Sequence, residues 1–416
     1  MTPEVKKRIE QIRQGIVPEG YKKGKIGIVP IKWNEVPFST LFTSTSEYTD
    51  DLKQYPLYSL TIEDGITAKT ERYERSHLVK KENSYKVVRP NDYAYNPMNI
   101  RFGAVARHKG DIPVAVSGYY DIFTTVHESD LVFMDSFLTY GPMITYYNKV
   151  STGSLVEKQR VHFSDFLEFS LALPTLEERK KIAAILSTQD KAIELQARKI
   201  EELKRFKKGC LEKMFPRKGQ KVPEKRFPGF TDNWEQRKFE EIAVRSSVIC
   251  SDANIPRVEY EDIVSGAGRL NKDIYAKQSS KSGIAFHQGD VLYGKLRPYL
   301  RNWLLPTFDG LAVGDFWVLQ PQNADSSFLY RLIQSRQFDE VANQSTGTKM
   351  PRADWKLVSK TVFSIPSKIS EQAAIGTYFT TLDNLITLHQ RKLEEMKRQK
   401  KALMQLLLTG IVRVKA

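Results

Sequence analysis

The sequence is poor in cysteine, with Cys210 and Cys250 as the only two in 416 residues. Two thiols in a chain of this length cannot build a disulfide framework or a cysteine-based zinc site. Long hydrophobic runs are also missing, since none approaches the ~18 residues that a membrane-spanning helix needs. The first residues lack the apolar core of a signal peptide. These absences predict a protein of a reducing cytoplasm that does not span a membrane.

Catalytic motifs are missing as well. The six histidines, at positions 77, 108, 127, 162, 287 and 389, show no metal-ligand spacing. Residues 289–296 come within one residue of a phosphate-binding loop, but Leu296 replaces the hydroxyl that would hold Mg²⁺. A strand end followed by basic residues is the better interpretation. The sequence therefore predicts a binding protein without catalytic residues, a metal site or a bound cofactor of its own.

Positive charge dominates among the residues that are present. The chain has 64 Lys and Arg against 49 Asp and Glu, which gives a formal charge of +15. This excess favours an anionic partner, with nucleic acid first among them. A hydrophobic share of 41% is that of a folded globular protein, and the length allows two or more domains.

Two long stretches, 174–216 and 366–410, have the heptad periodicity of packed helices. In the first, Leu186 and Ile200 belong to a row of residues that recurs every seven positions. Each position of this row has a counterpart 193 residues later, as Leu393 is the counterpart of Ile200. At ~1.5 Å per residue, each helix would be ~60 Å long. The sequence therefore predicts two duplicated helices.

The duplication extends beyond the helices, since Trp33 aligns with Trp234 and Tyr95 with Tyr293. Short β-branched and aromatic runs between turn residues indicate a mixed α/β domain before each helix. The expected fold class is α+β, with two such domains separated by two long antiparallel helices that form a coiled coil, and with an internal pseudo-twofold repeat. The expected segments are an N-terminal segment (1–35), the first mixed domain (36–173), the central helix (174–216), a basic linker (217–235), the second mixed domain (236–365), the C-terminal helix (366–410) and a tail (411–416).

Basic side chains interleaved with tyrosines cluster in both mixed domains. Lys and Arg can hold phosphates, and Arg and Asn can also read base edges in the major groove. For any single residue, a solvated surface charge is the alternative. The candidates for DNA contact in the first domain are Lys69, Arg72, Tyr73, Arg75, Lys80, Lys81, Arg89, Tyr95, Arg107 and Lys109. Those in the second domain are Arg269, Asn271, Lys272, Lys277, Lys281, Lys295, Arg297, Arg301, Lys349 and Arg352.

Polar residues interrupt the heptad rows at equivalent places. Gln196 and His389 lie near the midpoints of the two helices, so an antiparallel pairing would bring them face to face. We expect this pair to fix the helix register at some cost in stability. The alternative is that both side chains point to solvent or to a partner protein. Lys207 and Lys400 form a second equivalent pair, for which register control and partner docking are the expected roles.

The chain resembles the specificity subunit of a type I restriction–modification system over essentially its whole length. The resemblance rests on LPTLEERKKIAAIL and RKIEELKRFKKGCLEKMF in the first helix, on IPSKISEQAAI and RKLEEMKRQKKALMQLLLTG in the second, and on FPGFTDNWEQRKF before the second domain. One departure is Glu178-Arg179, because the family usually has Glu-Gln there, as at Glu371-Gln372 of this chain.

This resemblance implies a non-catalytic subunit in a complex of the prokaryotic cytoplasm. Each mixed domain would be a target recognition domain that reads one half of a bipartite sequence in double-stranded DNA, and the paired helices would set the spacing. The implied partners are two methyltransferase subunits, which bind S-adenosylmethionine and methylate adenine N6, and two restriction subunits, which use ATP and Mg²⁺. The family also implies that the two ends of the chain lie close together.

Two alternatives remain at this point. A solitary or fused DNA methyltransferase or nuclease would need a catalytic motif, which the sequence lacks. A non-enzymatic coiled-coil scaffold that binds DNA would not need two basic, aromatic-rich domains of different sequence.

Overall fold

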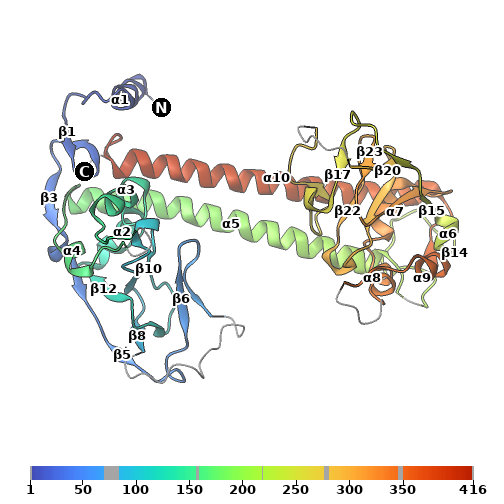
Figure 1. Cartoon of the computed structure of the whole chain (residues 1–416), viewed down its shortest axis with the longest axis horizontal. Helices are drawn as coiled ribbons and strands as arrows, with labels where there is room; N and C mark the ends of the chain where they lie inside the picture. The colour runs from blue at the N-terminus through green and yellow to red at the C-terminus, as the bar shows by residue number, and fades with distance from the viewer. Residues whose placement is uncertain are drawn as a thin grey trace. The chain divides into compact units, whose positions relative to one another are not determined.

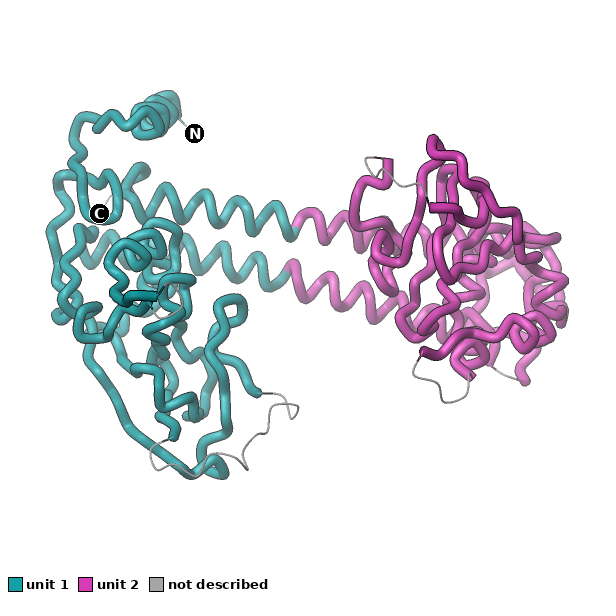
Figure 2. Tube along the Cα trace, in the orientation of Figure 1, with its two compact units in different colours: residues 1–195, 393–416 teal, residues 196–392 magenta. Residues whose placement is uncertain are grey.

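The computed structural model describes residues 2–69, 84–155, 159–217, 219–275, 281–344 and 350–414. The chain forms two compact units, which Figure 2 shows in separate colours. Unit 1 contains residues 1–195 and 393–416, and unit 2 contains residues 196–392. Each unit combines a mixed α/β domain with a part of two long helices (Figure 1).

The long helices are α5 (Leu176–Met214) and α10 (Ile369–Leu408). Neither contains proline, and the Thr175 hydroxyl starts α5 by accepting a hydrogen bond from the backbone N–H of Glu178 at 3.3 Å. Gly410 follows α10 with a φ of +68°, the left-handed conformation that commonly ends a helix. A Cβ on this residue would lie 2.5 Å from Pro30 Cγ, so the close approach also requires glycine. The long helices of the expected fold class are therefore present.

The two helices pair through equivalent ion pairs in both units. In unit 1, Lys400 Nζ lies 2.5 Å from Asp190 Oδ1. In unit 2, Lys207 Nζ lies 2.6 Å from Asp383 Oδ1. Rising residue numbers in α5 meet falling numbers in α10, so the helices are antiparallel, as the repeat predicts.

The predicted contact between Gln196 and His389 is confirmed. Gln196 Nε2 lies 2.9 Å from His389 Nδ1, and the same amide donates a hydrogen bond to the His389 carbonyl oxygen at 2.9 Å. Gln196 is only 9% exposed. The alternative that both side chains point to solvent is therefore wrong, while the role of the pair in fixing register stays a prediction.

The mixed domain of unit 1 is built on two small sheets. Its strands are β1 (Tyr21–Gly24), β2 (Gly27–Pro30), β3 (Asn34–Pro37), β4 (Phe42–Ser44), β5 (Tyr48–Thr49), β6 (Tyr58–Thr61), β7 (Gly65–Ala68), β8 (Tyr85–Val88), β9 (Tyr93–Tyr95), β10 (Val105–Arg107), β11 (Val114–Ser117), β12 (Asp121–Thr125) and β13 (Ser170–Leu173). Its helices are α1 (Pro3–Arg13), α2 (Leu131–Phe137), α3 (Gly141–Val150) and α4 (Phe163–Leu167). The sheet orders are β10-β9-β12-β4 and β11-β8-β5, while β6 and β7 form a hairpin and β13 pairs with β3.

The mixed domain of unit 2 repeats this plan. Its strands are β14 (Glu235–Lys238), β15 (Ala243–Ser246), β16 (Ile249–Cys250), β17 (Arg257–Val258), β18 (Ile263–Val264), β19 (Arg269–Leu270), β20 (Gly283–Phe286), β21 (Val291–Gly294), β22 (Trp303–Leu304), β23 (Gly310–Ala312), β24 (Phe316–Pro321) and β25 (Val362–Ile365). Its helices are α6 (Phe239–Ile242), α7 (Ser326–Leu332), α8 (Arg336–Ala342) and α9 (Trp355–Lys360). The sheet orders are β15-β24-β21-β22 and β16-β20-β23-β17, while β18 and β19 form a hairpin and β14 pairs with β25.

Strand register confirms the internal repeat. Tyr95 of β9 lies opposite Asp121 of β12, and Tyr293 of β21 lies opposite Trp317 of β24. The sequence aligns Tyr95 with Tyr293, and the strand pairing places Asp121 and Trp317 at equivalent positions. In both units the equivalent sheet packs with the short helices and with the long helices in one hydrophobic core cluster. The core therefore joins each mixed domain to the helices of its own unit.

A buried carboxylate joins each mixed domain to a long helix, and we call it the carboxylate anchor. In unit 2 the anchor is Glu371, which accepts hydrogen bonds from Trp234 Nε1 at 3.2 Å and from Arg226 at 2.5 and 2.7 Å. Both partners come from the central linker, before β14 begins at Glu235.

The anchor of unit 1 is Glu178, which accepts hydrogen bonds from Trp33 Nε1 at 3.3 Å and from Arg413 at 2.6 and 2.7 Å. Here the tryptophan and the arginine come from opposite ends of the chain. The Tyr21 hydroxyl also donates to the Gly410 carbonyl oxygen at 2.7 Å. The expected proximity of the two terminal segments is therefore confirmed, and together they do in unit 1 what the linker does in unit 2.

The departure at Arg179 has a structural reason. Its guanidinium donates two hydrogen bonds to the buried Asp130 carboxylate, at 2.7 and 2.9 Å, and a third to the Pro174 carbonyl oxygen at 3.0 Å. Gln372 stands at the equivalent place, where it donates to the Pro366 carbonyl oxygen and accepts from the backbone N–H of Asp325, both at 2.9 Å. Arg179 and Gln372 therefore make equivalent connections at the starts of the two long helices. The connection is ionic in unit 1 and neutral in unit 2.

Replacing both polar midpoint residues, Gln196→Leu with His389→Leu, should raise the thermal unfolding midpoint and loosen the helix register. Leucine removes the desolvation cost of a buried amide, while the directional bonds that select one register are lost. Register is measured by disulfide formation between cysteines introduced by Asp190→Cys with Lys400→Cys. A pair shifted by about one turn, Asp190→Cys with Lys397→Cys, is the control. Cross-linking confined to the first pair in the leucine variant would contradict the assigned role.

Candidate nucleic-acid interface

A basic cleft of about 640 Å³ lies in unit 2 between the mixed domain and the two long helices. The β18–β19 hairpin, Trp303 and α8 line it on the domain side, and α5 and α10 line it on the helix side. Cationic side chains outnumber acidic ones by two to one, so the cleft favours an anionic ligand. The cations are Lys204, Lys207, Lys208, Arg269, Arg301 and Arg336, and the acids are Glu212, Asp339 and Asp383.

Part of this charge belongs to a structural network. Asp383 pairs with Lys207, and its second oxygen accepts a hydrogen bond from Arg331 Nη1 at 2.7 Å. Arg331 is only 2% exposed. Burial lowers the pKa of the Lys207 ammonium, and the Asp383 carboxylate acts in the opposite direction. These three residues tie α7 to the long helices and leave the outer cations to face a ligand.

The outer cations of this cleft are accessible. Arg269 and Lys208 are exposed. Arg301 is half exposed, and its Nη2 lies 2.9 Å from Asp339 Oδ2. Surface ion pairs of this kind contribute only ~0–1 kcal/mol, so a phosphate could replace the carboxylate at small cost.

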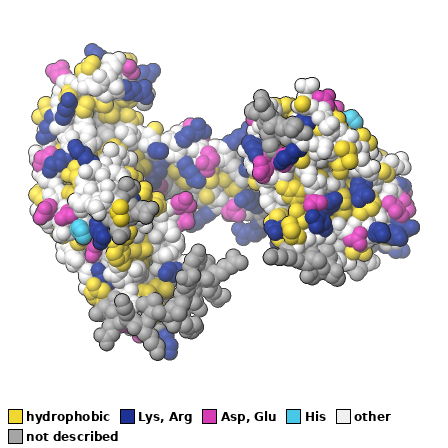
Figure 3. All heavy atoms as spheres, viewed as in Figure 1, with side chains coloured by type: hydrophobic (Ala, Val, Ile, Leu, Met, Phe, Trp, Pro, Cys, Tyr) yellow, Lys and Arg dark blue, Asp and Glu magenta, His cyan; other side chains and the backbone are white. Residues whose placement is uncertain are grey.

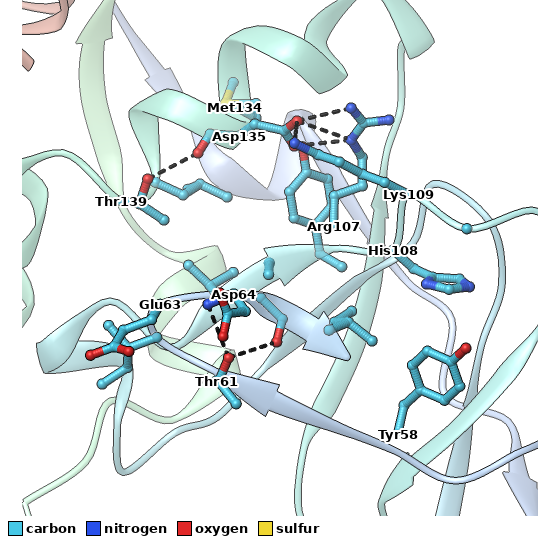
Figure 4. Close-up of a pocket in the computed structure, with 18 of the residues that line it drawn as sticks. Tyr58, Thr61, Glu63, Asp64, Arg107, His108, Lys109, Met134, Asp135 and Thr139 are labelled. Atoms are coloured by element: carbon cyan, nitrogen blue, oxygen red, sulfur yellow. Dashed lines mark hydrogen bonds and ion pairs between the residues drawn. The ribbon is translucent and has the colours of Figure 1, made fainter. Parts of the chain in front are cut away.

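The equivalent cleft of unit 1 has a volume of about 660 Å³. It lies between the β6–β7 hairpin, β10, α2 and Lys400 of α10. Lys400 and Lys207 are repeat equivalents, so each cleft includes the same lysine position of the helix pair. Figure 4 shows Asp135 on α2, with Arg107 and Lys109 directed toward its carboxylate. Acidic groups are more prominent in this cleft, which also includes Glu63, Asp64 and Asp111.

Asp135 is the central charge of the unit 1 cleft. Its carboxylate accepts hydrogen bonds from Arg107 Nε and Nη2, at 2.9 and 2.8 Å, and from the Tyr93 hydroxyl at 2.8 Å. Lys109 Nζ lies 3.2 Å away. Burial acts to raise the pKa of Asp135, but the Arg107 hydrogen bonds and the nearby cations outweigh it and hold the pKa below the ordinary value of 3.8. The group is therefore ionised at neutral pH, and it orients two of the predicted DNA-contacting cations.

One predicted DNA contact, Tyr95, is wrong. Its side chain is fully buried in the core of unit 1, and its hydroxyl donates a hydrogen bond to the Val161 carbonyl oxygen at 2.9 Å. The inward side of β9 packs against the ring of Phe166, so Tyr95 cannot reach a ligand without unfolding the domain.

Most of the other predicted contact residues lie next to acidic or carbonyl groups of their own unit. Lys272 binds the fully buried Asp262 carboxylate at 2.9 Å, which gives this lysine a structural role. Lys295 and Arg352 both contact Asp315, at 3.5 and 3.1 Å. The remaining members of this group are Arg89 with Glu47, Arg107 and Lys109 with Asp135, Asn271 with the Glu261 carbonyl, Lys281 with Glu259, and Arg301 with Asp339.

Three predicted contacts remain as exposed side chains without an ion pair in the described ranges, namely Lys69, Arg269 and Arg297. DNA contact by these and by the paired cations stays a prediction. Seven further candidates lie outside the described residues: Arg72, Tyr73, Arg75, Lys80, Lys81, Lys277 and Lys349.

The sequence interpretation overlooked the cations that the helices contribute. Lys204 and Lys208 of α5 and Arg336 of α8 line the unit 2 cleft. The basic run from Lys204 to Lys208 was a usable signal, but helix periodicity alone does not tell which outward positions face a neighbouring domain. Figure 3 shows Lys and Arg side chains spread over the visible face of each unit, with acidic groups among them. No single basic patch stands out on this face.

A family model described as the type I restriction modification DNA specificity domain matches residues 135–205 and 232–398, more than half of the chain. The chain belongs to this family. The matched ranges include most of both long helices and nearly all of the second mixed domain.

Individual relatives agree with this assignment. The MjaVIII type I restriction enzyme specificity subunit of Methanocaldococcus jannaschii is 26% identical over 274 residues, which cover 60% of this chain and 64% of the relative. The EcoDI specificity subunit of Escherichia coli is 25% identical over 227 residues, covering 47% of this chain and 51% of the relative. These alignments therefore span between half and two thirds of each relative.

A solved structure of a type I restriction–modification system S subunit from M. genitalium has the same fold. It superimposes with a TM-score of 0.53 at 14% identity, covering 91% of this chain and 96% of the other. Likeness at this identity concerns architecture alone. The expected fold class, with duplicated mixed domains and paired long helices, is thereby confirmed.

Within the described ranges, none of the helices has both the length and the apolar character that a membrane-spanning helix needs. No group of three or more His, Cys, Asp or Glu side chains is arranged there to hold a metal ion.

Asp135→Asn should destabilise unit 1 by ~2 kcal/mol at neutral pH, because Arg107 would lose its charged partner in a poorly solvated place. The pKa of Asp135 is lowered on folding, so its ionised form contributes stability above the ordinary value of 3.8 and loses it as pH falls through the folded pKa. The difference in unfolding free energy between wild type and variant should therefore narrow below about pH 4. Urea unfolding from pH 7 to pH 3 measures it. The exposed Asp111→Asn is the control, and a gap independent of pH would contradict the assignment.

Proposed function

We propose that this chain is the DNA specificity subunit of a type I restriction–modification complex. In this proposal each mixed domain contacts one half of a bipartite target in double-stranded DNA. The observation that carries the proposal is the duplicated cleft, which places a sequence-divergent β-hairpin opposite the same lysine position of a long helix. Family membership supports the same function.

The chemistry of the two clefts suits a divided task. Backbone phosphates need positive charge in a fixed place, which the outer helix cations beside Lys207, namely Lys204, Lys208 and Arg336, would supply in unit 2. Sequence reading needs side chains that differ between half-sites, and the β6–β7 and β18–β19 hairpins differ in this way. Arg269 belongs to the second hairpin, while Glu63 and Asp64 lie at the tip of the first. Arginine suits guanine and carboxylates suit the cytosine amino group, so the two half-sites should differ in sequence.

We assign the catalytic steps to partner subunits. Two methyltransferase subunits would bring S-adenosylmethionine and modify adenine, and two restriction subunits would bring ATP and Mg²⁺. The helix pair offers apolar surface for such docking, because Leu195 is 65% exposed and its repeat equivalent Leu388 is 63% exposed. Exposed leucines at duplicated positions suit two copies of one partner. The complex would act in the cytoplasm, where its DNA target is present.

Exchange of residues 36–173 for the corresponding domain of another such subunit should change one half of the target and leave the other half intact. The reason is that each domain packs against the helices of its own unit through a separate core and a separate carboxylate anchor. Methylome sequencing of cells that carry the exchanged chain with its methyltransferase partner measures both halves. The chain without partners serves as the control and should methylate nothing. A change in both halves, or methylation by the chain alone, would refute the proposal.

Removing two helix-borne cations of the unit 2 cleft, Lys204→Gln with Lys208→Gln, should weaken DNA binding uniformly across target sequences. Two lost phosphate contacts should reduce the slope of log affinity against log salt by ~2. Fluorescence anisotropy between 50 and 300 mM salt, with specific and scrambled duplexes, measures the slope. The control Lys6→Gln with Lys7→Gln removes the same charge from α1, outside both clefts. Equal slopes in the two variants would count against a role for the cleft.

A further inference from the structure

One loop of unit 2 has a backbone that its residue types do not favour. Arg297 and Arg301, on either side of the short 3-10 helix η7 (Pro298–Leu300), have φ values of +48° and +55°. Side chains with a Cβ rarely adopt this left-handed conformation, and asparagine tolerates it best. The other non-glycine residues with positive φ in the described ranges are Asn91 and Asn323. The two arginines are therefore the unusual cases.

Neighbouring segments hold the loop in this strained form. The Arg297 N–H donates to the Pro351 carbonyl oxygen at 2.7 Å, and the Arg301 carbonyl oxygen accepts from the Gly266 N–H at 3.0 Å. Inside the loop, the Leu300 N–H donates to the Arg297 carbonyl oxygen at 2.8 Å. The loop is thus fixed at both ends, so the Cα–Cβ bonds of its residues point in set directions.

The duplicated unit shows that the turn does not require arginines with a left-handed backbone. In unit 1 the same connection between β9 and β10 contains the 3-10 helix η3 (Ile100–Phe102), which ends at Gly103 with a φ of +96°. Strand register pairs Val105 with Tyr95 in unit 1 and Trp303 with Tyr293 in unit 2, which makes Gly103 the equivalent of Arg301. Unit 1 thus has glycine at the left-handed position that Arg301 occupies, and Asn99, the equivalent of Arg297 by the same register, has a φ of −103°.

The side chains of the loop are available to a ligand. Arg297 is exposed, and within the described residues no side chain forms a hydrogen bond or an ion pair with its guanidinium. Tyr299 is 56% exposed. Arg301 lines the basic cleft, and the Ser265 hydroxyl of the adjoining hairpin segment donates to the Leu300 carbonyl oxygen. The loop and the cleft therefore form one continuous surface.

We propose that Arg297 determines specificity in the second half-site by donating two hydrogen bonds to the major-groove edge of a guanine. This inference rests on the proposed function. Flexible surface lysines satisfy phosphates without backbone strain, as Lys204 and Lys208 of the cleft would. A strained and fixed backbone has value where the direction of a planar guanidinium matters, and reading guanine O6 and N7 is such a case. Tyr299 then lies beside the neighbouring base, and Arg301 exchanges Asp339 for a phosphate.

Two substitutions at this position separate its contributions. Arg297→Lys keeps the charge and the backbone strain but removes the two-pronged donor. Arg297→Gly removes the side chain and relieves the strain, so its thermal unfolding midpoint should equal or exceed that of the wild type. Asn323→Gly is the matched control, because it relieves a positive φ at an exposed position elsewhere in unit 2.

The test is selection of bound duplexes from a randomised library by the full chain in complex with its methyltransferase partner. Wild type and Asn323→Gly should select the same two-part sequence with a guanine in the second half. Both Arg297 variants should lose the preference for that one base pair by on the order of 10- to 100-fold and keep every other position. Uniform weakening across sequences, or unchanged preferences in Arg297→Lys, would overturn the inference. If the wild type selects no two-part sequence, the proposed function is overturned and the inference falls with it.

Discussion

The carboxylate anchor is the interaction on which the architecture of each unit depends. Glu178 and Glu371 are each 1% exposed, yet each is fully satisfied by a tryptophan indole and an arginine fork. The same contact joins three separate pieces of chain: the start of a long helix, the segment that enters the mixed domain, and a basic segment from the linker or the tail. Leaving such a carboxylate unpaired would cost ~3–5 kcal/mol, a large fraction of the stability of one domain. A duplicated scaffold can therefore tolerate divergent recognition surfaces.

The two units distribute their other buried charges differently. Unit 1 places its ionic bond at the start of α5, between Arg179 and Asp130. Unit 2 has neutral bonds at that place and sets its ionic bond further along the helix pair, between Arg331 and Asp383. Both solutions attach the helix that follows the four-stranded sheet, α2 or α7, to the long helices. Duplication has thus preserved the attachment while the residues that make it have changed.

Periodicity and internal comparison predicted what depends on local pattern. The long helices, their antiparallel pairing and the contact of Gln196 with His389 follow from heptad spacing and from a constant repeat interval. Tyr95 could not be placed in the same way. The local sequence of a tyrosine next to basic residues is the same whether its side chain points into the core or toward solvent. Lys204 and Lys208 were overlooked because a helix surface shows no sign of the domain that packs beside it. The left-handed backbone of Arg297 arises from bonds to Pro351, which no local pattern contains.

The anchor of unit 1 also orders the folding of the molecule in time. Trp33 and Glu178 leave the ribosome early, but Arg413 and the α10 residues that cover Ile182 and Leu186 follow after more than half of the chain has been made. At ~5–20 residues per second, the first domain waits on the order of ten seconds or more for its last structural contacts. The second domain lacks this delay, because Arg226, Trp234 and Glu371 precede the end of α10. The half of the molecule that is synthesised first is therefore the half that is completed last.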